Sequence, residues 1–117
     1  MNKADLERRT KSFAVDVITF VGGLPRTQVT GVLRNQLLRS GTSIGANYRE
    51  ANRAASRGDF AHKVSLVEKE AAETLYWLEL FEALDVGDGQ TRTRLLRESN
   101  ELIAIFTSIG RSLRNSK

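Results

Sequence analysis

The sequence predicts an all-α protein, a single-domain up-down-up-down antiparallel four-helix bundle over residues 1–117. Apolar residues recur at helical spacing in four long segments, and short turn-forming stretches separate these segments. The only proline, Pro25, lies in one of those stretches, and no run of alternating β-branched residues predicts a strand. Four helices joined by short turns pack as antiparallel neighbours, so these observations together indicate the bundle.

The first helix is predicted at about residues 3–21. Its apolar stripe contains Leu6, Phe13, Val17 and Phe20, which fall on one face because helical residues three, four and seven apart are neighbours. The helix should end at Gly22-Gly23-Leu24-Pro25, since paired glycines and a proline interrupt helices.

The second helix is predicted at about residues 27–55, and its inward side is unusually small and polar. Spacings of four and three residues place these side chains on one face: Leu33, Leu37, Ser40, Ile44, Asn47 and Ala51. Val29 and Val32 should extend that face toward the start of the helix. Gly41 and Gly45 each cost roughly 1 kcal/mol of helix propensity relative to Ala, so we expect a neighbouring backbone to approach them closely.

Two interpretations of this stretch remain open, a tightly packed helix pair inside the bundle or a face that meets another subunit. In both interpretations, the polar side chains that become buried need hydrogen-bond partners. Glu50 and Glu70 are expected to be partly buried and paired with Arg39 or Arg49. The residues assigned to packing or assembly are Gln36, Ser40, Gly41, Ser43, Ile44, Gly45, Asn47 and Glu50.

The third and fourth helices are predicted at about residues 60–86 and 91–114. Gly58 suits the end of the second helix, and either Ser56 or Asp59 suits the N-cap of the third. The third helix has the clearest stripe: Phe60, Val64, Val67, Ala71, Thr74, Leu78 and Phe81. After a turn at residues 85–89, the fourth helix has the stripe Leu95, Leu102, Ile105, Phe106, Ile109 and Leu113.

Composition excludes several classes of function. The chain has no cysteine and one histidine, which excludes disulfides, thiolate metal sites and a multi-histidine metal site within one chain. It also has no glycine-rich phosphate loop. From these absences together, we expect no metal and no cofactor. No apolar run approaches the ~20 residues that a membrane span needs, and the charged N-terminus does not resemble a signal peptide. The expected location is the cytoplasm, without membrane association.

Charge is divided sharply along the chain. Residues 1–58 carry a net +6, residues 59–90 a net −6 and residues 91–117 a net +4. Arginine predominates over lysine, which suits bidentate binding of phosphate. The predicted contacts to RNA or DNA are Arg49, Arg53, Arg57, Arg94, Arg97, Arg111 and Arg114.

The first three of these arginines are four residues apart and should form one stripe of the second helix. Tyr48 adjoins that stripe and is a possible base-stacking side chain. The alternative is that several of the arginines form ion pairs with the glutamates of the third helix: Glu68, Glu70, Glu73 and Glu79.

A short pattern near the start of the third helix suggests an alternative, enzymatic function. Arg57 and His62 have the R-x4-H spacing that resembles the ribonuclease signature of the HEPN superfamily. The histidine would act as a general acid or base on a ribose hydroxyl, while the arginine would stabilise charge on phosphate. This hypothesis is a metal-independent ribonuclease.

The central stretch also carries a resemblance to a known family. Gln36-Leu-Leu-Arg-Ser-Gly-Thr-Ser-Ile-Gly-Ala-Asn-Tyr-Arg-Glu50-Ala, with Asp59-Phe60 and Ala71-Ala-Glu-Thr-Leu-Tyr-Trp-Leu-Glu79, resembles the 23S rRNA intervening-sequence protein family. The resemblance covers about residues 10–115. One departure is Tyr48-Arg-Glu-Ala51, where the family commonly has Ile-Ala-Glu-Gly.

The resemblance implies a bacterial, non-enzymatic four-helix bundle that assembles as a homopentamer with a basic surface. The family includes the accessory variability protein of diversity-generating retroelements, which is implicated in binding a reverse transcriptase and nucleic acid. By this resemblance, the expected partners are further copies of the chain, RNA or DNA, and a reverse transcriptase or another nucleoprotein.

Overall fold

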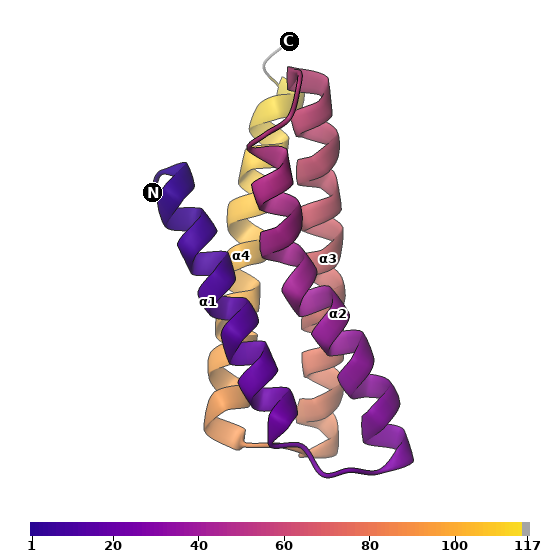
Figure 1. Ribbon diagram of the computed structural model, residues 1–117. Helices are drawn as coiled ribbons and strands as arrows, with labels where there is room; N and C mark the ends of the chain where they lie inside the picture. The colour runs from indigo at the N-terminus through magenta and orange to yellow at the C-terminus, as the bar shows by residue number, and fades with distance from the viewer. Residues whose placement is uncertain (116–117) are drawn as a thin grey trace.

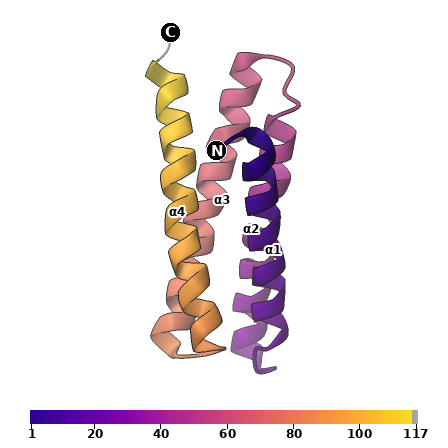
Figure 2. The ribbon, with the colours of Figure 1, turned by 90° about the vertical axis from the view of Figure 1, so that its left-hand side faces the viewer.

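The computed structural model describes residues 1–115 and confirms the antiparallel four-helix bundle (Figure 1). The helices are α1 (Lys3–Gly22), α2 (Gln28–Ala51), α3 (Arg57–Leu84) and α4 (Gly89–Asn115). Consecutive helices pack along much of their length, whereas α1 and α4 contact each other less extensively. The bundle measures 48 × 21 × 21 Å. The start of α1 and the end of α4 lie toward one end of it, together with the α2–α3 connection (Figures 1 and 2).

The boundary between α2 and α3 differs from the predicted one. α2 ends at Ala51, four residues before the predicted end, and α3 begins at Arg57. Ser56 is the N-cap, because its hydroxyl accepts a hydrogen bond from the Asp59 N–H at 3.1 Å. Gly58 therefore lies in the first turn of α3, and its assignment to the end of α2 was wrong.

The other two connections are held by a helix cap, buried polar side chains and a glycine in the left-handed region. Thr27 caps α2, and the Thr30 hydroxyl donates to the Pro25 carbonyl at 2.5 Å. In the α3–α4 turn, Gly87 has φ +90°, and a Cβ there would lie 2.6 Å from the Phe20 ring. The buried guanidinium of Arg92 closes this turn by donating to the Val86 carbonyl at 2.9 Å.

Side chains from all four predicted stripes form one core. Phe20 packs edge-on against Phe81 with ring centroids 5.7 Å apart, and Tyr48 packs in the same way against Phe106 at 5.3 Å. The predicted extension of the α2 apolar face was wrong, because Val29 and Val32 are 64% and 61% exposed. The largest fully buried side chains are Phe13, Phe81, Phe106, Leu37, Ile44, Leu78, Leu95 and Leu102.

The glycines of α2 allow α1 to approach closely. A Cβ on Gly41 would lie 3.0 Å from both methyl groups of Val17, and one on Gly45 would lie 3.1 Å from the Thr10 hydroxyl. Packing within the bundle therefore accounts for both glycines. On the other side of α2, the buried Ser40 and Thr74 hydroxyls are 2.9 Å apart, which satisfies polar groups between α2 and α3.

The other residues assigned to packing or assembly differ in exposure. Ile44 is buried in the core. Gln36, Ser43 and Asn47 are half-buried, and the Ser43 hydroxyl donates to the Arg39 carbonyl at 2.6 Å. Glu50 is exposed, so its predicted partial burial was wrong.

Candidate nucleic-acid interface

The antiparallel topology gathers five of the seven predicted arginines at one end of the bundle. The end of α2, the start of α3 and the end of α4 all lie at the end of the bundle toward which α1 begins (Figures 1 and 2). We call this the upper end, and the end that carries the other two connections the lower end. The arginines at the upper end are Arg49, Arg53, Arg57, Arg111 and Arg114, and all five are exposed.

Three of these arginines do not share a helix, contrary to the prediction of one stripe. Arg49 lies in the last turn of α2, Arg53 in the connection, and Arg57 at the first residue of α3. The prediction failed because the Ser56 cap starts a new helix before the stripe is complete. The three arginines instead lie on both sides of the α2–α3 connection and within it, so all three are still at the upper end.

Carboxylates on α1 and α4 form contacts with several of the arginines. Glu7 lies 3.7 Å from Arg49 and also accepts a hydrogen bond from the Asn52 amide at 2.9 Å. Farther from the upper end, Arg9 is held between α1 and α4, where it donates to both carboxylate oxygens of Glu98 at 2.6 and 2.7 Å. This pairing raises the Arg9 pKa above its ordinary value.

Two of the four α3 glutamates, Glu70 and Glu73, pair with Arg39, which is not one of the arginines predicted to bind nucleic acid. Arg39 contacts Glu70 at 3.1 Å and also contacts Glu73. The pairing of Arg39 with Glu70 agrees with the prediction. The hydrogen bond to Glu73 is the main cause of a raised Arg39 pKa. These two carboxylates therefore act on the α2–α3 face and not at the upper end.

The remaining two predicted arginines lie away from the other five. Arg94 and Arg97 are on the lower half of α4 and line a cleft of about 320 Å³ between α1 and α4. Arg94 is 3.7 Å from Asp16. The structure therefore brings five candidate arginines together and leaves two beside the lower half of α1.

Tyr48 is unsuited to base stacking. It is 3% exposed, and burial is the main cause of a phenol pKa above the usual value. Its ring packs in the core beside Phe106. The candidate phosphate-binding groups at the upper end are therefore guanidinium groups, and contacts to phosphate carry no sequence information.

The R-x4-H pair lies in the first two turns of α3 and does not share a face. Five residues correspond to about 140° around a helix axis, so Arg57 and His62 point in different directions. His62 lines a cleft of about 360 Å³ with Glu68 and Arg114. Arg114 was not linked to His62 in the sequence because the two residues are far apart along the chain. Gly110 leaves room for the Glu68 carboxylate.

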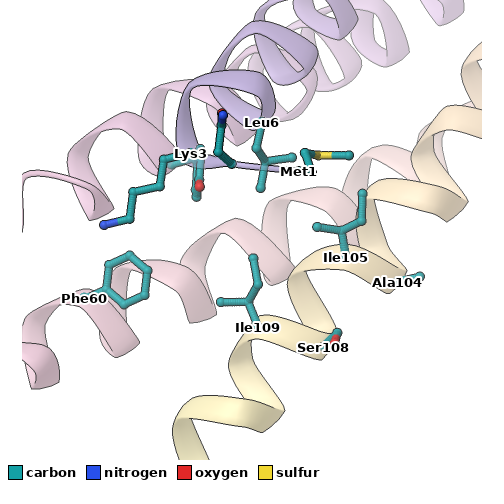
Figure 3. Close-up of a pocket in the computed structure, with 10 residues that line it drawn as sticks. Met1, Lys3, Leu6, Phe60, Ala104, Ile105, Ser108 and Ile109 are labelled. Carbon is teal, nitrogen blue, oxygen red and sulfur yellow. The ribbon is translucent and has the colours of Figure 1, made fainter.

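A third, larger cleft of about 610 Å³ opens between the start of α1 and α4. Figure 3 shows Leu6 and Met1 facing Ile105 and Ile109, with the Lys3 side chain extending toward Phe60. The Lys3 ammonium lies 5.7 Å from the Phe60 ring centroid. α4 extends past the start of α1 at this end (Figure 2), so these isoleucines are left partly uncovered.

The described part of the chain contains no cluster of three or more His, Cys, Asp or Glu side chains that could hold a metal ion. Within residues 1–115, no helix combines the length and the apolar character needed to cross a bilayer.

Comparison with known proteins gives a family for this bundle. Residues 2–108 match the model of the 23S rRNA-intervening sequence protein family. The chain belongs to this family. A crystal structure of an S23 ribosomal protein family member of unknown function from Bacteroides thetaiotaomicron is similar, with 37% sequence identity and a TM-score of 0.85. The match covers 95% of this chain and 99% of that one. No curated protein matches the sequence.

Membership confirms the family resemblance of the central stretch. The structural match extends over nearly the whole bundle, so all four helices belong to the shared fold. The upper-end arginines are supplied by three separate segments of this fold. Their proximity follows from its topology, and the sequence order alone did not reveal it.

Proposed function

We propose that this chain is a non-enzymatic, self-associating protein that binds the phosphate backbone of RNA or DNA through its upper end. The observation that carries the proposal is the gathering of five exposed arginines at that end. A planar guanidinium binds phosphate through two parallel hydrogen bonds. A cluster of such groups on three segments can follow successive phosphates along a strand.

The proposed binding is weakly sequence-specific. Phosphate contacts position a protein on a nucleic acid, whereas contacts to base edges or stacked bases distinguish sequences. Tyr48, the aromatic residue nearest these arginines in the sequence, is buried in the core. If all five arginines contact duplex phosphates, log K should fall against log salt with a slope of about −4.5.

Self-association, as a homopentamer in the cytoplasm, is the second part of the proposal. It is supported by the resemblance to the accessory variability protein of diversity-generating retroelements. That resemblance also suggests a reverse transcriptase or another nucleoprotein as a partner. Several copies with their basic ends on one side would bind one nucleic acid through many weak contacts, which multiplies affinity.

The test is fluorescence anisotropy of a labelled RNA hairpin and a DNA duplex at several salt concentrations. We expect the double variant Arg53→Gln, Arg111→Gln to bind both probes more weakly and to reduce the salt slope by about two. The matched control Arg26→Gln, Arg34→Gln removes the same charge from the lower half. Equal losses in both variants would indicate a general charge effect and would refute a site at the upper end.

The absence of catalysis is tested separately. The separation of Arg57 and His62 around α3 disfavours their acting on one phosphodiester. We therefore expect no RNA cleavage from the purified protein without added metal, and His62→Ala should bind RNA as the original chain does. Cleavage by the original chain that disappears in His62→Ala would establish the ribonuclease alternative.

A further inference from the structure

α1 carries a second stripe on the side away from its core residues. Its members are spaced by four and three residues, and every one of them is exposed: Ala4, Arg8, Lys11, Val15, Ile18 and Gly22. Val15 and Ile18 are each 52% exposed. We call this the α1 outer stripe. It is apolar toward the lower end and basic toward the upper end, where Arg8 also contacts Asp5.

An apolar patch lies on a different side of the bundle, over the lower part of α2 and α3. The ion pair between Arg39 and Glu73 fixes the register of these antiparallel helices. Two turns from that pair toward the lower end lie Val32 on α2 and Leu80 on α3. One further turn brings in Val29 and Leu84, and Leu84 is 55% exposed. We call Val29, Val32, Leu80 and Leu84 the α2–α3 patch.

The surface above the α2–α3 patch is acidic. Glu70 and Glu73 share the single guanidinium of Arg39, so this group of three side chains carries excess negative charge. Glu50, further toward the upper end on α2, is exposed. Above its apolar part, this face therefore carries an acidic band at mid-height, below the upper-end arginines, while the α1 outer stripe changes from apolar to basic.

We propose that the α1 outer stripe of one copy packs against the α2–α3 patch of a second copy. This inference rests on the proposed self-association and names the surfaces that produce it. With the two copies pointing the same way, apolar side chains meet at the lower half, and Arg8 and Lys11 meet the acidic group. In this same-direction arrangement, pairing either face with its own copy would bring like charges together, which costs affinity.

Contact between two different faces is heterologous, so each copy retains one unused face after the first contact. Such contacts repeat from copy to copy, and they produce a ring when the rotation closes. Because every contact has the same orientation, all the upper ends point toward one side of the assembly. The basic ends then form one multivalent surface, in agreement with the proposed binding to nucleic acid.

Two variants test the pairing, because each one disables a single face. Val15→Glu, Ile18→Glu adds acidic charge to the α1 outer stripe, and Val29→Glu, Val32→Glu adds it to the α2–α3 patch. All four positions are more than half exposed, so the changes should leave the helices folded, as circular dichroism will verify. Thr93→Glu, Asn100→Glu, at exposed positions of α4, is the charge-matched control.

The readout is light scattering on a size-exclusion column. We expect the original chain and the control to assemble, and each face variant alone to elute as a monomer of 13.0 kDa. In an equimolar mixture, each variant supplies the intact face that the other lacks. The mixture should therefore give a dimer of about 26 kDa, twice the chain mass, and should grow no further.

The failures of the two proposals are distinguishable. An original chain that is monomeric at micromolar concentration refutes self-association itself. An assembling original chain whose face variants also assemble refutes these surfaces while self-association stands. Face variants that are monomeric separately and stay monomeric when mixed refute the pairing of two different faces.

Discussion

Replacement of Gly41 by alanine tests the close packing of α2 against α1. The new Cβ would lie 3.0 Å from both methyl groups of Val17, which is shorter than ordinary contact between carbon atoms. Val17 and Gly41 are both buried, so the side chains have little room to move. Overpacking of this kind costs about 1–3 kcal/mol. Alanine returns about 1 kcal/mol of helix propensity, which leaves a net loss of roughly 0–2 kcal/mol.

Gly31→Ala is the matched control, because Gly31 belongs to the same helix and has room for a methyl group. Its nearest neighbour would be the Arg34 guanidinium at 3.7 Å, an ordinary contact. We expect this variant to be unchanged or stabilised by up to about 1 kcal/mol. The two variants should therefore differ by about 1–3 kcal/mol, or roughly 4 °C in Tm for each kcal/mol.

The assay is urea and thermal unfolding followed by circular dichroism, at one fixed chain concentration because assembly would shift Tm. A third variant, Gly41→Ala with Val17→Ala, removes the methyl groups that the new Cβ meets. Its destabilisation should be smaller than the sum of the two single changes, since neighbouring sites are coupled. Equal stabilities of Gly41→Ala and Gly31→Ala would refute the close-packing explanation.

Three further predictions concern local features. Ser56→Ala removes the cap that accepts the Asp59 N–H and should lower the urea-unfolding free energy by about 1 kcal/mol. Burial raises the Tyr48 pKa above 10.0. The stability that the buried neutral phenol contributes is therefore fully present below pH ~10 and is lost as pH rises through the folded-state pKa. Absorbance titration near 295 nm should detect this, and Tyr48→Phe should remove it. Arg92→Met leaves the Val86 carbonyl without its donor and should increase amide exchange in the α3–α4 turn.

The core was predictable from the sequence where the apolar spacing admits a single face. On α3, the predicted positions Val64, Val67, Ala71 and Leu78 are all fully buried, because three heptads of unbroken spacing leave no alternative. At the start of α2, apolar residues occur on two adjacent stripes, and spacing cannot select between them. Leu33 packs against the core, whereas Val29 remains exposed.

The helix ends were less predictable because local sequence offers several competing signals. Both Ser56 and Asp59 can cap a helix, and the alanines at 54 and 55 favour continuation of α2. In the structure these two candidates act together. Ser56 accepts from the Asp59 N–H, and the Asp59 carboxylate accepts from the Ala55 N–H at 3.2 Å. That reciprocal pair stops α2 early and divides the arginine stripe.

The candidate site was predictable by residue type but not by position. Arginine content indicated phosphate binding, yet tertiary packing decided which arginines face water. Arg92 is buried in a turn and Arg9 is held by Glu98, whereas Arg53 and Arg111 are exposed at one end. Burial of Tyr48 was similarly hidden, because its neighbour in the core is Phe106 on another helix.

The two proposed activities use different parts of the bundle, and this makes them separable. Phosphate would bind at the upper end, whereas the apolar contacts with a second copy would lie along the lower half of the sides. A variant such as Val15→Glu, Ile18→Glu should therefore lose avidity for a long RNA while keeping the contacts of a single chain. On a short probe that only one chain can occupy, its salt slope should stay near that of the original protein. The arginine variants should show the reverse, with assembly retained and the salt slope reduced.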